Sequence, residues 1–157
     1  MRLKTLQFLA IMLTALVLVP TGAHFFVLPN KIGLPQEAYF TVQAIYRGWA
    51  LFGLMQMAAL AANLSLAMAL RDQRWPFWLV VSAFIFIAGS LVIFFTWTCP
   101  ANQATDNWTL VPPNWRELRA QWEYSHAVNA VLTFAALGAV TLAVVLAKPT
   151  LSTGPRS

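Results

Sequence analysis

The sequence predicts an all-α integral membrane protein, a four-helix bundle with two long outer loops. Hydrophobic residues make up 59% of the 157 residues and charged residues only 10%, whereas about a quarter of an ordinary soluble domain is charged. Four apolar stretches are each long enough to cross a hydrocarbon core of roughly 30 Å as a helix. Four spans use up most of the chain, so we expect one transmembrane domain over residues 1–157.

The four expected spans cover residues 6–28, 48–70, 75–97 and 124–147, and none of them contains Asp, Glu, Lys or Arg. Each can therefore meet lipid while the helix satisfies its own backbone groups. The first span has an alternative reading as a signal peptide, because Arg2 and Lys4 precede an apolar run that reaches Thr21-Gly22-Ala23, a sequence resembling a small-residue cleavage site. The run continues to Leu28, which favours a span.

The distribution of cations predicts the orientation. One side of the expected bundle carries Arg2, Lys4, Arg71, Arg74, Lys148 and Arg156, and the other carries Lys31, Arg47, Arg116 and Arg119. Since cytoplasmic ends are enriched in Lys and Arg, we expect a protein of the cell membrane with both termini in the cytoplasm.

The net charge of +5 does not indicate nucleic-acid binding, because the cations stand singly at the ends of apolar runs and form no basic patch. The expected partners are the lipid bilayer and a hydrophobic small molecule. The sequence leaves the oligomeric state open.

Both outer connections contain helical signals. Residues 36–46 suit a short interfacial helix, and Cys99-Pro100 is expected to end the third helix. Asn114 and Glu117 have the spacing of a capping box. The last helix should therefore begin near Trp115, run to Ala147 and project beyond the bilayer, with a length of about 50 Å.

Small and polar residues recur on each span at alternating steps of three and four residues, the spacing of a seam that faces other helices. The four seams are Ala10, Thr14, Val17, Thr21 and His24; Gly53, Gln56, Leu60, Asn63 and Ala67; Ser82, Phe86, Gly89, Ile93 and Thr96; and Arg119, Trp122, His126, Asn129, Thr133 and Ala136. Most of these polar side chains, Gln56 and Asn63 among them, are expected to form hydrogen bonds between helices.

The two histidines are the basis of a specific hypothesis about a functional site. His24 and His126 should lie at similar depth, and an ionisable residue inside a span indicates function by default. We therefore expect a polar pocket at the outer end of the bundle, although a hydrogen-bonded structural role is an equal alternative for each histidine. The expected lining is His24, His126 and Asn129 beneath the loop that contains Asn102, with Trp122 as an apolar wall and Arg119 at the mouth.

A metal site is the weaker alternative. Glu123-x-x-His126 has the spacing used in di-iron bundles, but those sites need two such motifs and two further Glu. The nearest available set is His24, His126 and Glu123, a triad of two histidines and one carboxylate. We favour an ion pair of Glu123 with Arg119 or Arg116 and expect no metal.

Three segments resemble one known family. They are the Phe-rich run from Gly22 to Asn30, Pro100-x-Asn102 after the third span, and Trp115-x-x-x-Arg119-x-x-Trp122 followed by His126 and Asn129. Together they make the chain similar to the anthrone-oxygenase-like four-helix membrane proteins, a domain-of-unknown-function family. The sequence departs from the common pattern at His126-Ala-Val-Asn129, where many members have an Asn and an Arg.

The resemblance implies an oxidoreductase that acts on a flat, hydrophobic phenolic substrate with molecular oxygen and without a bound cofactor. A catalytic role for neutral His24 or His126 would be removal of an acidic C–H or O–H proton. Arg119 or Asn129 would then stabilise the anion. Asn102 and Trp122 complete the expected substrate-binding residues.

A non-enzymatic small-ligand binder or accessory membrane subunit is the alternative, and the sequence does not decide between the two. A conduit fits less well, because few polar residues fall at mid-membrane.

Overall fold

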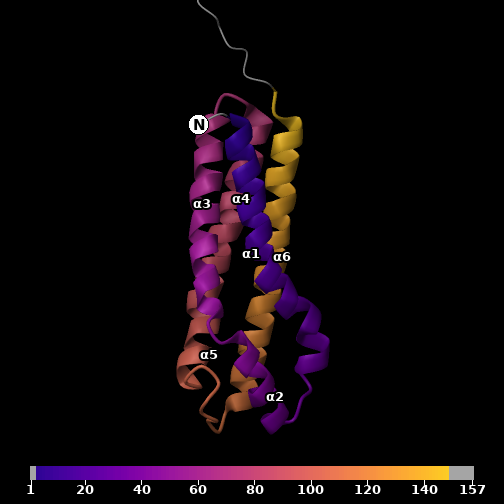
Figure 1. Ribbon diagram of the computed structural model, residues 1–157, viewed down its shortest axis with the longest axis vertical. Coiled ribbons are helices and arrows are strands. Elements are labelled where there is room, and N and C mark those ends of the chain that lie inside the picture. Colours follow the sequence, from indigo (N-terminus) through magenta and orange to yellow (C-terminus); the bar gives the residue numbers. More distant parts are fainter. Residues whose placement is uncertain (1–2, 149–157) are drawn as a thin grey trace, which may run out of the picture.

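The computed structural model describes residues 3–148, and this part of the chain is all-helical, without a strand. Its four long helices are α1 (Leu3–Lys31), α3 (Phe52–Ala69), α4 (Arg74–Ile93) and α6 (Trp115–Leu146). With the short helical segments that continue them, four helices are long and apolar enough to cross a membrane. They run side by side along the long axis of the molecule (Figure 1), so the predicted number and class of helices is confirmed.

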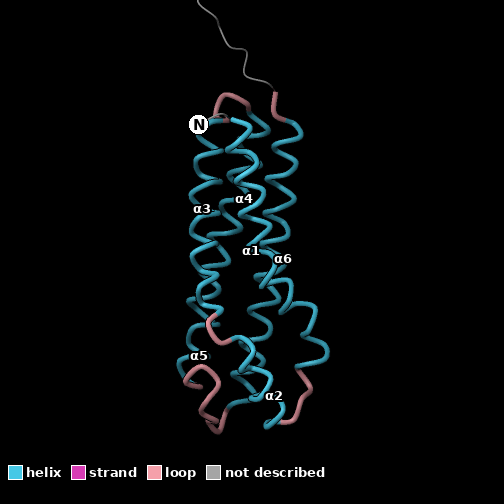
Figure 2. The backbone as a smooth tube through the Cα atoms, viewed as in Figure 1, coloured by secondary structure: helices cyan, strands magenta, loops and turns pink. Residues whose placement is uncertain are grey.

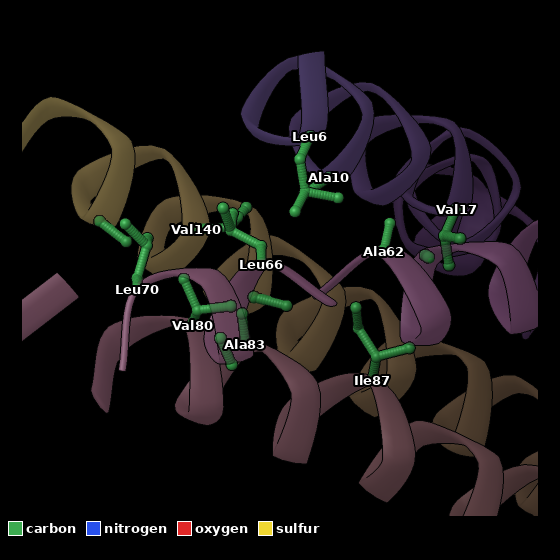
Figure 3. Close-up of a cluster of buried hydrophobic side chains, with 14 residues drawn as sticks. Leu6, Ala10, Val17, Ala62, Leu66, Leu70, Val80, Ala83, Ile87 and Val140 are labelled. Carbon is green, nitrogen blue, oxygen red and sulfur yellow. The ribbon is translucent and has the colours of Figure 1, made fainter. Parts of the chain in front are cut away.

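The bundle is held together by small and aliphatic side chains from all four long helices. Figure 3 shows this core, in which Ala10, Leu66, Ala83 and Val140 have no exposed surface. The small side chains of Ala10 and Ala83 let the helices approach closely, as in membrane helix packing generally.

Most residues of the expected seams of α1 and α6 are buried, with Thr21, Arg119 and His126 only partly so, whereas the expected seam of α4 is wrong. On α4 the buried residues are Pro76, Val80, Ala83, Ile87 and Ser90, one position away from the predicted face. Because α4 is apolar on every side, hydropathy does not single out a face. Ser82 can also point away from the core, since its hydroxyl donates to the Trp78 carbonyl of its own helix at 2.9 Å.

Amide side chains connect neighbouring helices, as predicted for Gln56 and Asn63. Gln56 Nε2 donates to Ser90 Oγ at 2.7 Å, which joins α3 to α4. Asn63 Nδ2 donates to Thr14 Oγ1 at 3.0 Å, which joins α3 to α1.

The third span does not end at Cys99-Pro100, contrary to expectation. After Ile93 the chain passes through a π-helical turn, η3 (Phe94–Thr98), into α5 (Cys99–Ala104). The proline falls in the first turn of α5, where its missing N–H is not required. The wider π-turn therefore allows the helix to continue through a residue that normally stops one.

The connections at the end of the bundle that holds α2 and α5, here called the α2 end, are largely helical (Figure 2). A short helix is present where one was predicted, as α2 (Gln36–Gln43), followed by the 3₁₀ turns η1 (Ala44–Tyr46) and η2 (Trp49–Leu51). α1 continues through Pro29 to Lys31 and so takes in residues that were expected to be loop.

α1 bends away from the other helices in the half nearer the α2 end (Figure 1). Pro20 lies inside this helix and cannot donate a backbone hydrogen bond to the preceding turn, which is the usual cause of such a bend.

α6 begins at Trp115 as predicted, but the expected capping box is not formed. Asn114 occupies the N-cap position without a side-chain cap, and its φ of −95° and ψ of 26° lie outside the extended region typical of N-caps. The backbone of Asn114 instead accepts hydrogen bonds from the amides of Glu117 and Leu118 at 3.1 and 3.2 Å.

The cations on which the expected orientation depends lie at the two ends of the bundle. Lys4 is near the start of α1, while Arg71 and Arg74 flank the turn between α3 and α4. Arg2 and Arg156 lie outside the described residues.

Candidate functional site

A buried charged cluster joins α1, α2 and α6 at the α2 end. Lys31 Nζ, on the last turn of α1, lies 2.9 Å from Glu123 Oε1 of α6 and donates to Gln43 Oε1 at 3.1 Å. The same carboxylate oxygen accepts the Tyr39 hydroxyl at 2.9 Å, and Gln43 Nε2 donates to that hydroxyl at 2.7 Å. All four residues are buried.

Aromatic rings surround the Lys31 ammonium. Its Nζ lies 4.3 Å from the ring centroid of Tyr46, 4.4 Å from that of Trp122 and 5.2 Å from that of Tyr39. These are cation–π distances, and together with Glu123 and Gln43 they compensate the loss of water around a buried charge. The ammonium is thus fully engaged by the protein itself.

Tyr39 is a neutral donor in this cluster. Burial, and then the nearby charge of Glu123, raise the pKa of the Tyr39 phenol far above its ordinary value. Burial followed by the same carboxylate raises the pKa of Tyr46 to about 12. Both hydroxyls therefore keep their protons at neutral pH.

His24 and His126 lie directly against each other. Their ring centroids are 4.0 Å apart with an interplanar angle of 28°, a stacked arrangement. Trp122 packs against both rings, at 4.9 Å from His24 and 4.2 Å from His126, and Tyr46 covers His24 at 4.4 Å. The prediction that the two histidines are brought together is confirmed.

Several buried polar atoms near the histidines have no hydrogen-bond partner. They are Nδ1 of His24, Nδ1 of His126, Oε2 of Glu123 and Oδ1 of Asn129. Glu123, His126 and Asn129 follow one another at steps of three residues on α6, so they share one face of that helix. A buried polar atom without a hydrogen-bond partner is costly, and each of these three residues contributes one such atom.

The other predicted site residues are held by contacts within the protein. Asn102 Oδ1 accepts the indole N–H groups of Trp122 at 2.8 Å and Trp108 at 3.1 Å. Arg119 donates from Nη1 to the Leu34 carbonyl at 2.7 Å and lies over the ring of Trp115. Asn102 thus positions the indole that packs on both histidines, while Arg119 ties α6 to the segment before α2.

A groove of about 640 Å³ lies between α1 and α6, on the segments of these helices that also carry His24 and His126, although neither histidine lines it. Its lining is apolar and includes small residues on both helices; the lining residues are Leu18, Val19, Gly22, Ala23, Phe25, Phe26, Ala130, Val131 and Phe134. Ala23 and Phe25 flank His24 in the sequence, and Ala130 lies one turn after His126. The groove forms where α1 bends away from the bundle.

The groove and the predicted outer pocket differ in position. The pocket was expected to open at the outer end of the bundle, but at the α2 end Tyr39, Lys31 and Glu123 leave 0%, 2% and 1% of their surfaces exposed. The bulky rings of Tyr46 and Trp122 fill the remaining space over His24. The hollow lined by α1 and α6 is instead lateral, on the side of the bundle.

The expected ion pair of Glu123 with Arg119 or Arg116 is wrong, since Glu123 pairs with Lys31. α1 continues past Pro29 to Lys31, and this brings Lys31 to Glu123. The sequence spacing within α6 does not reveal a partner on another helix. Within residues 3–148, no three His, Cys, Asp or Glu side chains lie close enough together to hold a metal ion.

Lys31, Tyr39, Gln43 and Tyr46 were not among the predicted site residues. One signal in the sequence could have indicated part of this cluster. Lys31 follows the first apolar span and Glu123 precedes the last one, so the two residues can form an ion pair at one end of the bundle.

Comparison of the chain with family models, with curated proteins and with solved structures finds no match.

Proposed function

We propose that this chain is a multi-pass protein of the cell membrane, with both termini in the cytoplasm, that binds a hydrophobic small molecule from the bilayer. The observation that carries the proposal is the apolar groove of about 640 Å³ between α1 and α6, on the segments of these helices that also carry the stacked His24 and His126. A volume of this size falls within the usual range for small-molecule sites.

The exposed surface of the long helices supports membrane integration. Phe26, Trp75, Phe134 and Val145 expose 78%, 71%, 68% and 74% of their surfaces. A soluble monomer rarely exposes large apolar residues over so wide an area, whereas a hydrocarbon environment favours them.

Lateral entry of the ligand follows from the same geometry. The buried cluster of Lys31, Tyr39 and Glu123 closes the α2 end, and the groove opens on the side of the bundle. In a bilayer this side faces acyl chains, so the molecule that reaches the groove is one that partitions into lipid.

A pair of glycine variants tests the proposal. Gly22 lines the groove, whereas Gly138 lies elsewhere on α6. A Cβ atom added at either glycine meets no atom within 4 Å. Gly22→Leu should therefore fill the groove without disturbing the fold, and Gly138→Leu is the matched control. Mass spectrometry of small molecules that copurify in mild detergent should detect a hydrophobic compound with the wild type and the control but not with Gly22→Leu. Equal recovery from all three proteins would refute the groove as the site.

An oxygen-dependent oxidoreductase is the second candidate, favoured by the two stacked imidazoles of α1 and α6 and by the resemblance to the anthrone-oxygenase-like family. A neutral imidazole would accept a proton from an acidic methylene of a flat phenolic substrate, and the resulting carbanion would react with molecular oxygen. The test is oxygen uptake with such a phenol by wild type and by His126→Leu. Uptake that depends on His126 supports an enzyme, and uptake equal to a protein-free control removes this candidate.

A further inference from the structure

We infer that the end of the bundle opposite α2 is a binding surface for the head groups of anionic phospholipids. This end, here called the α3–α4 end, contains the turn between α3 and α4, the start of α1 and the end of α6 (Figure 1). No residue of the surface lines the groove between α1 and α6. The α3–α4 end is therefore a second site of interaction, separate from the proposed ligand site.

The two ends of the bundle differ in net charge. Among the described residues, the α3–α4 end carries four cations and one acid, a net charge of +3; these residues are Lys4, Arg71, Arg74, Lys148 and Asp72. The α2 end carries four cations and four acids, a net charge of zero; these residues are Lys31, Arg47, Arg116, Arg119, Glu37, Asp106, Glu117 and Glu123. An anion at the membrane surface is therefore attracted to the α3–α4 end.

The cations of the α3–α4 end are available to a partner. Lys4, Arg74 and Lys148 are exposed. Arg71 lies 4.0 Å from Asp72, and both side chains are exposed, so this pair holds the guanidinium only weakly. No other ion pair within residues 3–148 includes a cation of this end.

Gln73 brings together cations from two separate parts of the chain. Its side-chain Nε2 donates to the Lys148 carbonyl at 3.2 Å, and its Oε1 accepts the Lys148 backbone N–H at 2.8 Å. These two hydrogen bonds fasten the residue that follows α6 to the turn that carries Arg71 and Arg74. A phosphate group has several charged oxygens, and here it meets cations from both segments.

Two exposed indoles place this surface at the boundary between lipid and water. Trp75 and Trp78, in the first turns of α4, expose 71% and 58% of their surfaces, and tryptophan is enriched at the level of the head groups. The Arg74 guanidinium lies 6.0 Å from the ring centroid of Trp75. A phospholipid can contact the cations through its head group and the apolar side chains through its acyl chains, whereas a free anion gains only the charges. The partner is therefore a lipid.

Lipid retention in native mass spectrometry tests this surface. The full-length protein is equilibrated in mild detergent with equal amounts of dioleoyl-phosphatidylglycerol and dioleoyl-phosphatidylcholine, which share their acyl chains and differ in net charge. The wild type should retain more phosphatidylglycerol than phosphatidylcholine. An excess of inorganic phosphate at constant ionic strength should leave this ratio unchanged. Displacement of phosphatidylglycerol by phosphate would show a site for the free anion and would overturn the assigned partner.

Two double variants with the same loss of charge locate the effect. Arg71→Gln with Arg74→Gln should lower the ratio of the two lipids at least about fivefold, since one cation near an anionic surface contributes about that factor. Arg47→Gln with Arg116→Gln, a change of two exposed cations at the α2 end, should keep the wild-type ratio.

The outcomes separate this surface from the groove. Equal retention of the two lipids by the wild type, or an equal loss of preference in both double variants, would overturn the inference, because the charge of the α3–α4 end would then have no effect of its own. Gly22→Leu, which fills the groove, should keep the wild-type ratio. A preference that is lost in Gly22→Leu and kept in the variant of Arg71 and Arg74 would place the lipid in the groove, which contradicts this inference and leaves the proposed function standing.

Discussion

The ammonium of Lys31 lies 2.9 Å from Oε1 of Glu123, and both side chains are almost completely buried. This pair joins the last turn of α1 to α6, and Tyr39 and Gln43 attach α2 to it. The α2 end of the bundle is thus closed by a network in which one carboxylate oxygen serves both the ammonium and the phenol.

The first prediction concerns the stability of this network. Glu123→Gln leaves the Lys31 charge buried without a counterion, and breaking a buried pair in this way typically costs about 3–5 kcal/mol. Thermal unfolding in detergent should show a markedly lower Tm. Asp72→Asn is the control, because the Arg71 and Asp72 side chains expose 76% and 91% of their surfaces and such a pair contributes little.

A double replacement separates charge burial from simple loss of contact. Lys31→Met with Glu123→Leu removes both charges, and buried pairs replaced by apolar residues are often no less stable. The double variant should unfold at a higher temperature than Glu123→Gln. A Tm as low as that of the single variant would show that the hydrogen bonds, and not the charges, dominate.

The second prediction concerns Asn102, whose side-chain oxygen accepts two indole N–H groups. Asn102→Leu leaves both donors without this acceptor and should reduce stability by roughly 1–3 kcal/mol. Near-ultraviolet circular dichroism should also change, because Trp108 and Trp122 lose their orientation. Gln103→Leu, an exposed position on the same helix, should leave both signals as in the wild type.

The third prediction concerns the start of α6. Since Asn114 makes no side-chain cap, Asn114→Ala should cost less than about 0.5 kcal/mol, below the roughly 1 kcal/mol of a true N-cap. Equilibrium unfolding in detergent and denaturant measures this difference. A loss of 1 kcal/mol or more would show that the side chain caps the helix in solution.

The fourth prediction concerns orientation. In a Cys99→Ser background, one cysteine added after Ser157 should resist a membrane-impermeant thiol reagent in intact cells and react once the cells are opened. The Cys99→Ser change is needed because Cys99 is the one cysteine of the sequence and is partly accessible. Labelling of the added cysteine in intact cells would place the C-terminus outside.

The sequence predicted the parts of the structure that depend on periodicity within one helix. The four long apolar runs, the start of α6 and the common depth of His24 and His126 all follow from the rise and repeat of an α-helix. The inward faces of α1 and α6 were predictable because polar residues mark them.

The remaining features depend on contacts between helices or on local departures from ideal geometry. The pair of Lys31 and Glu123 requires α1 to continue through Pro29, and the groove requires a bend in α1 beside small residues such as Gly22 and Ala130. The π-turn before Cys99 lets Pro100 sit inside a helix. None of these produces a periodic signal in the sequence.

The most direct test of the central claim is photo-crosslinking with a decyl amphiphile that carries a diazirine in its tail. After irradiation of the protein in lipid nanodiscs, peptide mass spectrometry locates the labels. Ligand binding in the groove predicts saturable labels concentrated in residues 18–26 and 130–134, which disappear in Gly22→Leu and persist in Gly138→Leu. Labels that never saturate and spread evenly over the exposed faces of α3 and α4 would contradict it, because they would show an amphiphile that behaves as bulk lipid.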